Sequence, residues 1–278
     1  MHVVQLLPEL NEGGVERGAV EISRELVKRG HKSTVISAGG SLVSQVKSDG
    51  GRHVMLPIAA KNPLTVPARM WVLRRALHEL VPDVLHARSR MPAWLTHFAK
   101  RPLCIPWVTT VHGLNRINAY SRIMTAGDRV IAVGEAVKAH VVDGYSLAPD
   151  SVRVIQRGVD MRAFSSTNLD MEFIQQIRTQ YSLANCLVAV AVGRVTFLKD
   201  YESLIDAAAR LRNHTKRPLK VLIVGGAHPK KENYFQSLLK RVDAHSLGDS
   251  VHFLGSQTKV AELYQLSDLS VNVALKMG

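Results

Sequence analysis

Short apolar runs rich in Val, Ile and Leu alternate with longer segments of helical period along almost the whole chain. An apolar run of this length, bounded by turn residues, is typical of a strand buried on both faces, as in a parallel sheet. The runs predicted as strands are Val3–Leu7, Ser33–Ser37, Val54–Leu56, Val84–His86, Trp107–Val111, Val130–Val133, Val152–Ile155, Leu187–Val192, Val221–Val224, Val251–Leu254 and Leu269–Ala274. The segments predicted as helices are Val15–Arg29, Ala68–Leu80, Ala136–Val142, Leu204–Asn213, Asn233–Ala244 and Lys259–Gln265. This alternation predicts an α/β fold with doubly wound parallel sheets.

The chain is long enough for two domains of ordinary size, because its 278 residues can bury two separate cores. The segment Gly158–Asp170 is polar, rich in turn residues and without period, which is typical of a linker. We therefore expect a Rossmann-like N-terminal domain over 1–165 and a second Rossmann-like domain over 166–278.

The formal charge of +13, set against a charged fraction of only 21%, shows that the basic groups are unbalanced rather than merely abundant. Such an excess favours acidic partners, namely phosphates, anionic lipid or nucleic acid. Aromatic residues make up only 5% of the chain and no nucleic-acid motif is present, so nucleic acid is not expected among the partners.

The two cysteines, Cys104 and Cys186, have no partner at metal-ligand or redox-motif spacing, so we expect buried free thiols, as in a reducing cytoplasm. The amino end has no basic leader, and no apolar run approaches the ~20 residues that span a bilayer. The helical segment from Ala68 to His78 mixes Met, Trp and Leu with three arginines, a pattern that fits an anionic membrane surface and equally fits packing on the protein's own core. The expected location is cytoplasmic, with peripheral contact at the inner face of the cytoplasmic membrane as one alternative.

Two cations follow the predicted strand that ends at Val192, namely Arg194 and Lys199. In an open parallel α/β sheet, ligands bind at the carboxyl ends of the strands, so this loop predicts a clamp for a diphosphate. A basic, solvated strand-to-helix loop is the alternative from this segment alone.

Three further loops carry candidate binding residues in the first half. Gly13 and Gly14 open the first predicted helix, and glycines there let backbone N–H groups approach an anion or a sugar hydroxyl, although a tight turn alone also requires glycine. His112 follows the strand Trp107–Val111, where it can exchange protons near neutral pH or occupy a satisfied loop position. Arg88 and Arg90 follow another strand, where they can meet an anionic acceptor or lie in a solvated turn.

Taken in order, these motifs resemble the retaining nucleotide-sugar glycosyltransferases of family 4, also called group 1, which have the GT-B fold. The resemblance rests on the segments 13–17, 86–90, 110–113, 129–133, 154–160 with Phe164, and 193–194 ahead of Lys199, and it covers the whole chain. Members that build lipopolysaccharide cores are the most similar in this pattern. Each motif by itself is weak evidence for the family, whereas the complete set in this order is specific for it.

The resemblance implies sugar transfer from a UDP- or GDP-linked donor to a lipid-linked or glycan acceptor, with retention of the anomeric configuration and no obligatory metal or other cofactor. It implies that Arg194 and Lys199 bind the donor diphosphate and stabilise charge on the leaving group, with Gly14 beside them, and that His112 lies by the donor sugar. Gly13, Glu16, Arg88 and Arg90 fall on the cleft and acceptor side. An inactive remnant that acts as a binding module and a nucleotide-sugar epimerase of the same fold are the alternatives.

Two departures from the family pattern bear on these expectations. Asp200 follows Lys199 where the family usually has glycine, which predicts a crowded or partly neutralised phosphate site. The chain also stops at Gly278, before the acidic loop and the Glu-x₇-Glu helix that in the family grip the donor. The sequence therefore predicts an incomplete second domain with an exposed sheet edge after Leu269–Ala274.

Overall fold

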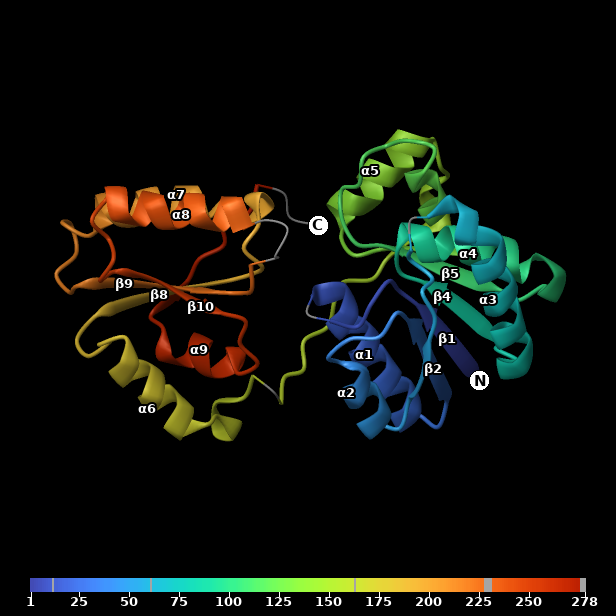
Figure 1. Ribbon diagram of the computed structural model, residues 1–278, viewed down its shortest axis with the longest axis horizontal. Coiled ribbons are helices and arrows are strands. Elements are labelled where there is room, and N and C mark those ends of the chain that lie inside the picture. The colour runs from blue at the N-terminus through green and yellow to red at the C-terminus, as the bar shows by residue number, and fades with distance from the viewer. Residues whose placement is uncertain (12, 61, 163, 228–231, 276–278) are drawn as a thin grey trace. The chain divides into compact units, whose positions relative to one another are not determined.

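The computed structural model describes residues 1–11, 13–60, 62–162, 164–227 and 232–275, which form two compact units. The first unit extends from Met1 to Arg157, and the second begins at Gly158, the first residue of the segment expected to be the linker. Each unit is an open parallel sheet with helices on both faces, so the predicted doubly wound α/β class is confirmed (Figure 1).

The first unit contains a seven-stranded parallel sheet in the order β3-β2-β1-β4-β5-β6-β7. Its strands are β1 (His2–Leu6), β2 (Lys32–Ser37), β3 (Arg52–Met55), β4 (Val84–Ala87), β5 (Trp107–Val111), β6 (Arg129–Ala132) and β7 (Val152–Val154). Its helices are α1 (Gly14–Lys28), α2 (Val43–Ser48), α3 (Val66–Leu80), α4 (Arg90–Lys100) and α5 (Glu135–Tyr145). The chain reverses its direction of winding between β1 and β4, and this switch point is where ligands bind in such sheets.

The two faces of this sheet have separate apolar cores, because neighbouring strand residues point to opposite sides. Val35 packs with Ala19 and Val20 of α1, whereas Ile36 packs with Leu73 and Leu77 of α3. Figure 1 shows α1 and α2 on one face and α3 and α4 on the other.

The second unit contains a four-stranded parallel sheet in the order β10-β9-β8-β11, with the switch point between β8 and β11. Its strands are β8 (Leu187–Val192), β9 (Leu219–Val224), β10 (Val251–Gly255) and β11 (Leu269–Ser270), and its helices are α6 (Met171–Gln180), α7 (Tyr201–Leu211), α8 (Glu232–Ala244) and α9 (Val260–Leu266). Helices α7 and α8 cover one face, and α6 and α9 cover the other (Figure 1).

Two expectations about this architecture are wrong. The last strand was expected over Leu269–Ala274 and extends only from Leu269 to Ser270, where it pairs with β8. Cys104 is exposed, because it lies in a left-handed conformation (φ 50°) after a short 3₁₀ turn and ahead of β5; Cys186 is buried as expected.

Candidate functional site

The turn after β8 brings two glycines together at the carboxyl edge of the second sheet. A Cβ on Gly225 would lie 2.0 Å from the carbonyl oxygen of Gly193, so the two strand ends approach more closely than any side chain allows. A Cβ on Gly193 would lie 2.7 Å from Cε of Lys199. The backbone of Gly193 therefore lies directly beneath the aliphatic part of the Lys199 side chain.

Tyr201, at the start of α7, fixes the conformation of this turn. Its hydroxyl donates a 2.7 Å hydrogen bond to the carbonyl oxygen of Gly193, and its ring is 2% exposed. Burial raises the pKa of Tyr201 to about 12, so the hydroxyl keeps its proton at neutral pH. The sequence pattern did not single out this tyrosine, which is visible only as an aromatic residue two positions after Lys199.

Arg194 is exposed and Lys199 is half-buried at this edge. Within the described ranges, neither side chain has a hydrogen-bond or ion-pair partner. Two cations next to a bare glycine backbone, with no counter-ion in the part of the chain that the structure describes, are suited to an anionic ligand with more than one charge.

Asp200 is the N-cap residue of α7 and adopts the left-handed conformation, with φ 51° and ψ 47°. Glycine adopts this conformation without steric cost, and aspartate is one of the few other residues that tolerate it. The Asp200 carboxylate accepts a 2.7 Å hydrogen bond from the Ser203 hydroxyl, so its local partner belongs to α7.

In the first unit, the switch-point edge brings together Gly14, Glu16, Arg88, His112 and Arg157. Helix α1 begins at Gly14 with no side-chain cap, which leaves N–H groups of its first turn available. A Cβ on Gly14 would lie 2.0 Å from Nη1 of Arg157, and a Cβ on Gly13 would lie 2.2 Å from Oε2 of Glu16. A guanidinium and a carboxylate thus lie against the glycine backbone at the N-terminus of α1.

Arg88 is buried, at 5% exposure, and is not the solvated turn residue that was one alternative. Its Nη1 donates to Oε1 of Gln5 at 3.2 Å, and its Nε has no partner. Burial, and secondarily the charge of Arg157, lower the pKa of Arg88 to about 10, so it remains a cation at neutral pH.

Arg90 lies apart from these contacts. Arg90 is the first residue of α4. Its Nη1 donates a hydrogen bond to the Ser121 hydroxyl at 3.2 Å, and its guanidinium is 5.3 Å from the Tyr120 ring centroid. Its partners therefore belong to the segment after β5. Among the contacts of the described residues, none joins Arg90 to Arg88.

Arg157 lies within the motif 154–160, and the sequence pattern does not predict it as a site residue. It follows β7 in the same way as Arg194 follows β8, so a cation just after an apolar strand is the signal that identifies it. Its Nη2 lies 3.3 Å from Nδ1 of His112. Because a guanidinium only donates hydrogen bonds, Nδ1 accepts and the ring hydrogen is on Nε2, which has no partner.

His112 is kept neutral by its surroundings. Burial, then the charges of Arg88 and Arg157, lower its pKa to about 3. His86 lies beneath it in β4, where its Nε2 is 2.7 Å from Oγ1 of Thr110, and burial with the charge of Arg88 lowers its pKa to about 3 as well. A histidine with so low a pKa is not suited to exchange protons near pH 7, which was one expectation for His112. It is suited to hydrogen bonding, which was also expected of this residue.

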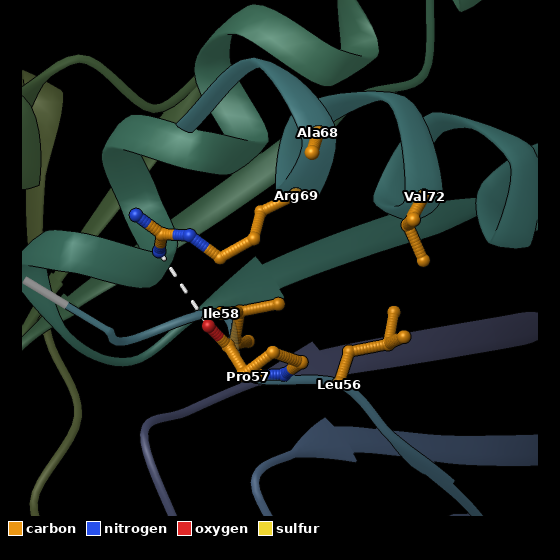
Figure 2. Close-up of a pocket in the computed structure, with 6 residues that line it drawn as sticks. All are labelled: Leu56, Pro57, Ile58, Ala68, Arg69 and Val72. Atoms are coloured by element: carbon orange, nitrogen blue, oxygen red, sulfur yellow. Dashed lines mark hydrogen bonds between the residues drawn. The ribbon is translucent and has the colours of Figure 1, made fainter. Parts of the chain in front are cut away.

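The arginines of α3 are largely used within the fold. Arg69 is 7% exposed and donates to the Thr65 hydroxyl and to the carbonyl oxygens of Pro57 and Asn62. Figure 2 shows its guanidinium directed to the Pro57 oxygen, at the side of an apolar pocket of about 120 Å³. The pocket is lined by Leu56, Pro57, Ile58, Ala68, Arg69 and Val72.

The described residues offer neither a cluster of metal ligands nor a helix that could span a membrane. No group of three or more His, Cys, Asp or Glu side chains is arranged to hold a metal ion within the described ranges. None of the helices that the structure describes has the length and apolar character needed to cross a bilayer.

The model of Glycosyltransferase Family 4 matches residues 12–163, which is more than half of the chain, and the model of Glycosyl transferases group 1 matches residues 173–275. A D-inositol 3-phosphate glycosyltransferase of Gordonia bronchialis is 28% identical over 212 residues, covering 67% of this chain and 45% of that protein. The chain spans about half the length of this relative and of the one from Salinispora arenicola, of which it covers 47%.

Solved structures show the same architecture. A glycosyltransferase from Rickettsia africae superimposes with a TM-score of 0.84 at 28% identity, over 99% of this chain and 73% of that one. Anabaena HepE in complex with UDP and glucose superimposes with a TM-score of 0.85 at 19% identity, over 99% and 74% of the two chains, which shows the shared fold. The expected GT-B fold is thereby confirmed, and the chain belongs to glycosyltransferase family 4, with its second unit matching the glycosyl transferases of group 1.

Proposed function

We propose that the protein transfers a sugar from a nucleotide-sugar donor to an acceptor hydroxyl, with retention of the anomeric configuration. The observation that carries this proposal is the pair of cations Arg194 and Lys199, which have no counter-ion among the described residues and lie beside the bare backbone of Gly193 at the carboxyl end of β8. Family membership supports the reaction class, and neighbours solved with UDP and with UDP-glucose support a nucleotide-sugar donor.

In the proposed reaction, the bond between the anomeric carbon and the donor phosphate oxygen breaks, and a bond to the acceptor oxygen forms on the same face of the sugar. Negative charge grows on the leaving diphosphate, and fixed cations stabilise it most at that stage. Arg194 and Lys199 would supply those charges without a metal. The acceptor proton would pass to the leaving diphosphate, since His112 is a weak base with a pKa of about 3. We propose that the Nε2–H of His112 donates to a hydroxyl of the donor sugar.

A thermal-shift screen with UDP-, GDP- and ADP-sugars tests this proposal on the chain as it stands. Binding to the folded state alone raises the melting temperature by mass action. We expect a rise with sugars of one nucleotide base at millimolar concentration, with UDP-glucose as the first donor to test. No rise with any of the three classes would contradict the proposal. In a separate activity assay, product formed from the donor without an acceptor would favour the epimerase alternative.

The acceptor and its location remain predictions. Curated relatives are named for D-inositol 3-phosphate, so the lipopolysaccharide-core role expected from the resemblance receives no support from their names. The proposed place of action is the cytoplasm, at the inner face of the membrane if the acceptor is lipid-linked.

We also propose that the surface around α3 contacts an anionic membrane through apolar side chains more than through its arginines. Leu64, in the 3₁₀ turn that precedes α3, is 87% exposed and Trp71 of α3 is 60% exposed, whereas Arg75 is paired with Glu79. Inserting a tryptophan and a leucine at a lipid interface contributes on the order of 1.5–3 kcal/mol for each side chain that becomes fully buried.

Replacing both Leu64 and Trp71 with Ala is expected to lower sedimentation with phosphatidylglycerol-containing vesicles at least about tenfold, because their apolar area would be lost. Leu211→Ala is the control, since Leu211 is 50% exposed at the end of α7 in the other unit. An equal loss in the control, or no sedimentation of the unmodified protein, would contradict the contact.

A further inference from the structure

The turn after β8 contains a main-chain donor that the described part of the fold does not use. The N–H of Gly193 donates to the carbonyl oxygen of Val224 at 2.8 Å. The N–H of Val195 donates to the carbonyl oxygen of Gly226 at 3.0 Å, so both donors point to β9 and the residues after it. The N–H of Arg194 lies between these two in sequence and has no partner among the described residues.

The pairing of β8 fixes the direction of this N–H. Along a strand in a parallel sheet, successive N–H groups point to alternate neighbours, and those of Gly193 and Val195 point to β9. The N–H of Val188, which shares the even positions with Arg194, donates to the carboxylate of Asp268, directly before β11. The N–H of Arg194 therefore points to the β11 side, beyond the residues with which β11 pairs. This is the switch point, where ligands bind in open parallel sheets.

Tyr201 holds the other side of the same peptide unit. Its hydroxyl donates to the carbonyl oxygen of Gly193 at 2.7 Å, and its ring is buried, so the ring cannot swing away from the turn. In a trans peptide unit, the C=O group and the following N–H point in opposite directions. A carbonyl fixed on Tyr201 therefore fixes the N–H of Arg194 toward the switch point.

Side-chain contacts do not restrain this peptide unit, because glycines lie on both sides of it. A Cβ on Gly225 would lie 2.0 Å from the carbonyl oxygen of Gly193 and 3.0 Å from the nitrogen of Arg194. Gly193 has no Cβ either, and glycine changes its backbone dihedrals at little steric cost. Rotation of the unit would turn a carbonyl oxygen toward the switch point, where it would repel a phosphate. The hydrogen bond from Tyr201 opposes this rotation.

We propose that the main-chain N–H of Arg194 is a third donor to the donor diphosphate, beside the side chains of Arg194 and Lys199, and that Tyr201 is the positioning residue that directs it there. This inference rests on the proposed function. Lysine has a flexible side chain that follows a phosphate through several positions, whereas a main-chain N–H held in one orientation selects the position of one oxygen. Tyr201 acts through the carbonyl of Gly193.

The amide proton of Arg194, followed by NMR while the chain is titrated with UDP, tests the third donor. A hydrogen bond to a charged oxygen is short and strong, so we expect this proton to move downfield as UDP saturates the chain. Uridine is the control ligand, because it has the same base and ribose without phosphate. A change with UDP no larger than the change with uridine would overturn the inference and leave the two-cation clamp intact. A chain that binds no UDP at all would contradict the proposed function itself.

Tyr201→Phe tests the positioning role, because phenylalanine keeps the buried ring and removes only the hydroxyl. We expect UDP affinity, measured by calorimetry well below the melting temperature, to weaken about tenfold, as the loss of one hydrogen bond to a charged group predicts. We also expect the downfield change at Arg194 to be lost.

Tyr234→Phe is the matched control. The Tyr234 hydroxyl in α8 donates to the carboxylate of Glu202 in α7, so its removal also breaks one hydroxyl bond to this unit but leaves the carbonyl of Gly193 paired. We expect UDP affinity to stay within about twofold of the unmodified chain. A purely structural role would lower the melting temperature of Tyr201→Phe and leave its UDP affinity and the Arg194 amide shift unchanged, which would overturn the positioning role.

Discussion

Replacing Arg194 with Ala is expected to weaken UDP binding about 10- to 100-fold, and replacing Lys199 as well is expected to weaken it by a further factor of similar size. A hydrogen bond to a charged group contributes about 1.5–3 kcal/mol, and tenfold in affinity corresponds to about 1.4 kcal/mol. Both cations lack protein partners among the described residues, so their removal leaves no buried carboxylate behind and changes binding more than folding.

Isothermal titration with UDP measures these losses, with Arg210→Ala as the control. Arg210 is an exposed arginine near the C-terminal end of α7, in the same unit, so its removal reproduces the change in net charge without touching the turn after β8. Equal weakening by Arg210→Ala would mean that UDP responds to the general charge of the protein. Unchanged affinity in Arg194→Ala would remove Arg194 from the clamp.

Mild acid is expected to destabilise the first unit through His86 and His112. Both have a folded pKa of about 3, well below the ordinary value of about 6.5, because burial and neighbouring arginines disfavour the charged imidazole. The unfolded chain therefore binds more protons below about pH 6.5, so the stability present above that pH is lost as the pH falls toward 3. For each histidine the loss is on the order of 1.4 kcal/mol per pH unit in that window, or roughly 2 kcal/mol between pH 6.5 and pH 5.

Urea unfolding at pH 7.5, 6 and 5 measures this loss, and His86→Gln separates one histidine from the other. Glutamine keeps a donor and acceptor for the Thr110 hydroxyl but does not titrate, so the dependence of the unfolding free energy on pH should weaken by about one proton. The same pH dependence in the variant and in the unmodified chain would show that His86 carries its charge in the folded state.

The strands could be predicted from the sequence because most are buried on both faces and therefore apolar at nearly every position. The alternation inside them decides which core each residue joins: Val190 packs toward α6 and α9, whereas Ala189 and Ala191 pack toward α7 and α8. The strand expected over Leu269–Ala274 pairs with β8 only as far as Ser270. The apolar run does not predict where this pairing ends.

Three helices, α2, α4 and α6, were not predicted. Helix α4 carries Pro92, which the first turn of a helix tolerates because its N–H has no partner there, although a proline in a short segment suggests a break. Helix α6 begins after Asp170, whose carboxylate accepts from the N–H of Phe173, so the cap lies at the last residue of the segment read as linker.

The candidate site was only partly predictable. Arg194 and Lys199 follow an apolar strand directly, and a strand end fixes where such side chains lie. The burial of Arg88 depends on how Gln5 and Gly18 pack around it. The spacing of these residues along the chain does not predict either contact. The role of Tyr201 depends likewise on the return of its hydroxyl to the carbonyl oxygen of Gly193.

The central claim is that the donor diphosphate binds in the turn after β8, and amide chemical shifts measured during a UDP titration test it most directly. We expect the largest shift changes on the amides of residues 193–199, with the Gly193 amide among them, and we expect them to disappear in the Arg194→Ala, Lys199→Ala double variant. Changes confined to residues of the first unit, or no changes in residues 193–199 at saturating UDP, would contradict it.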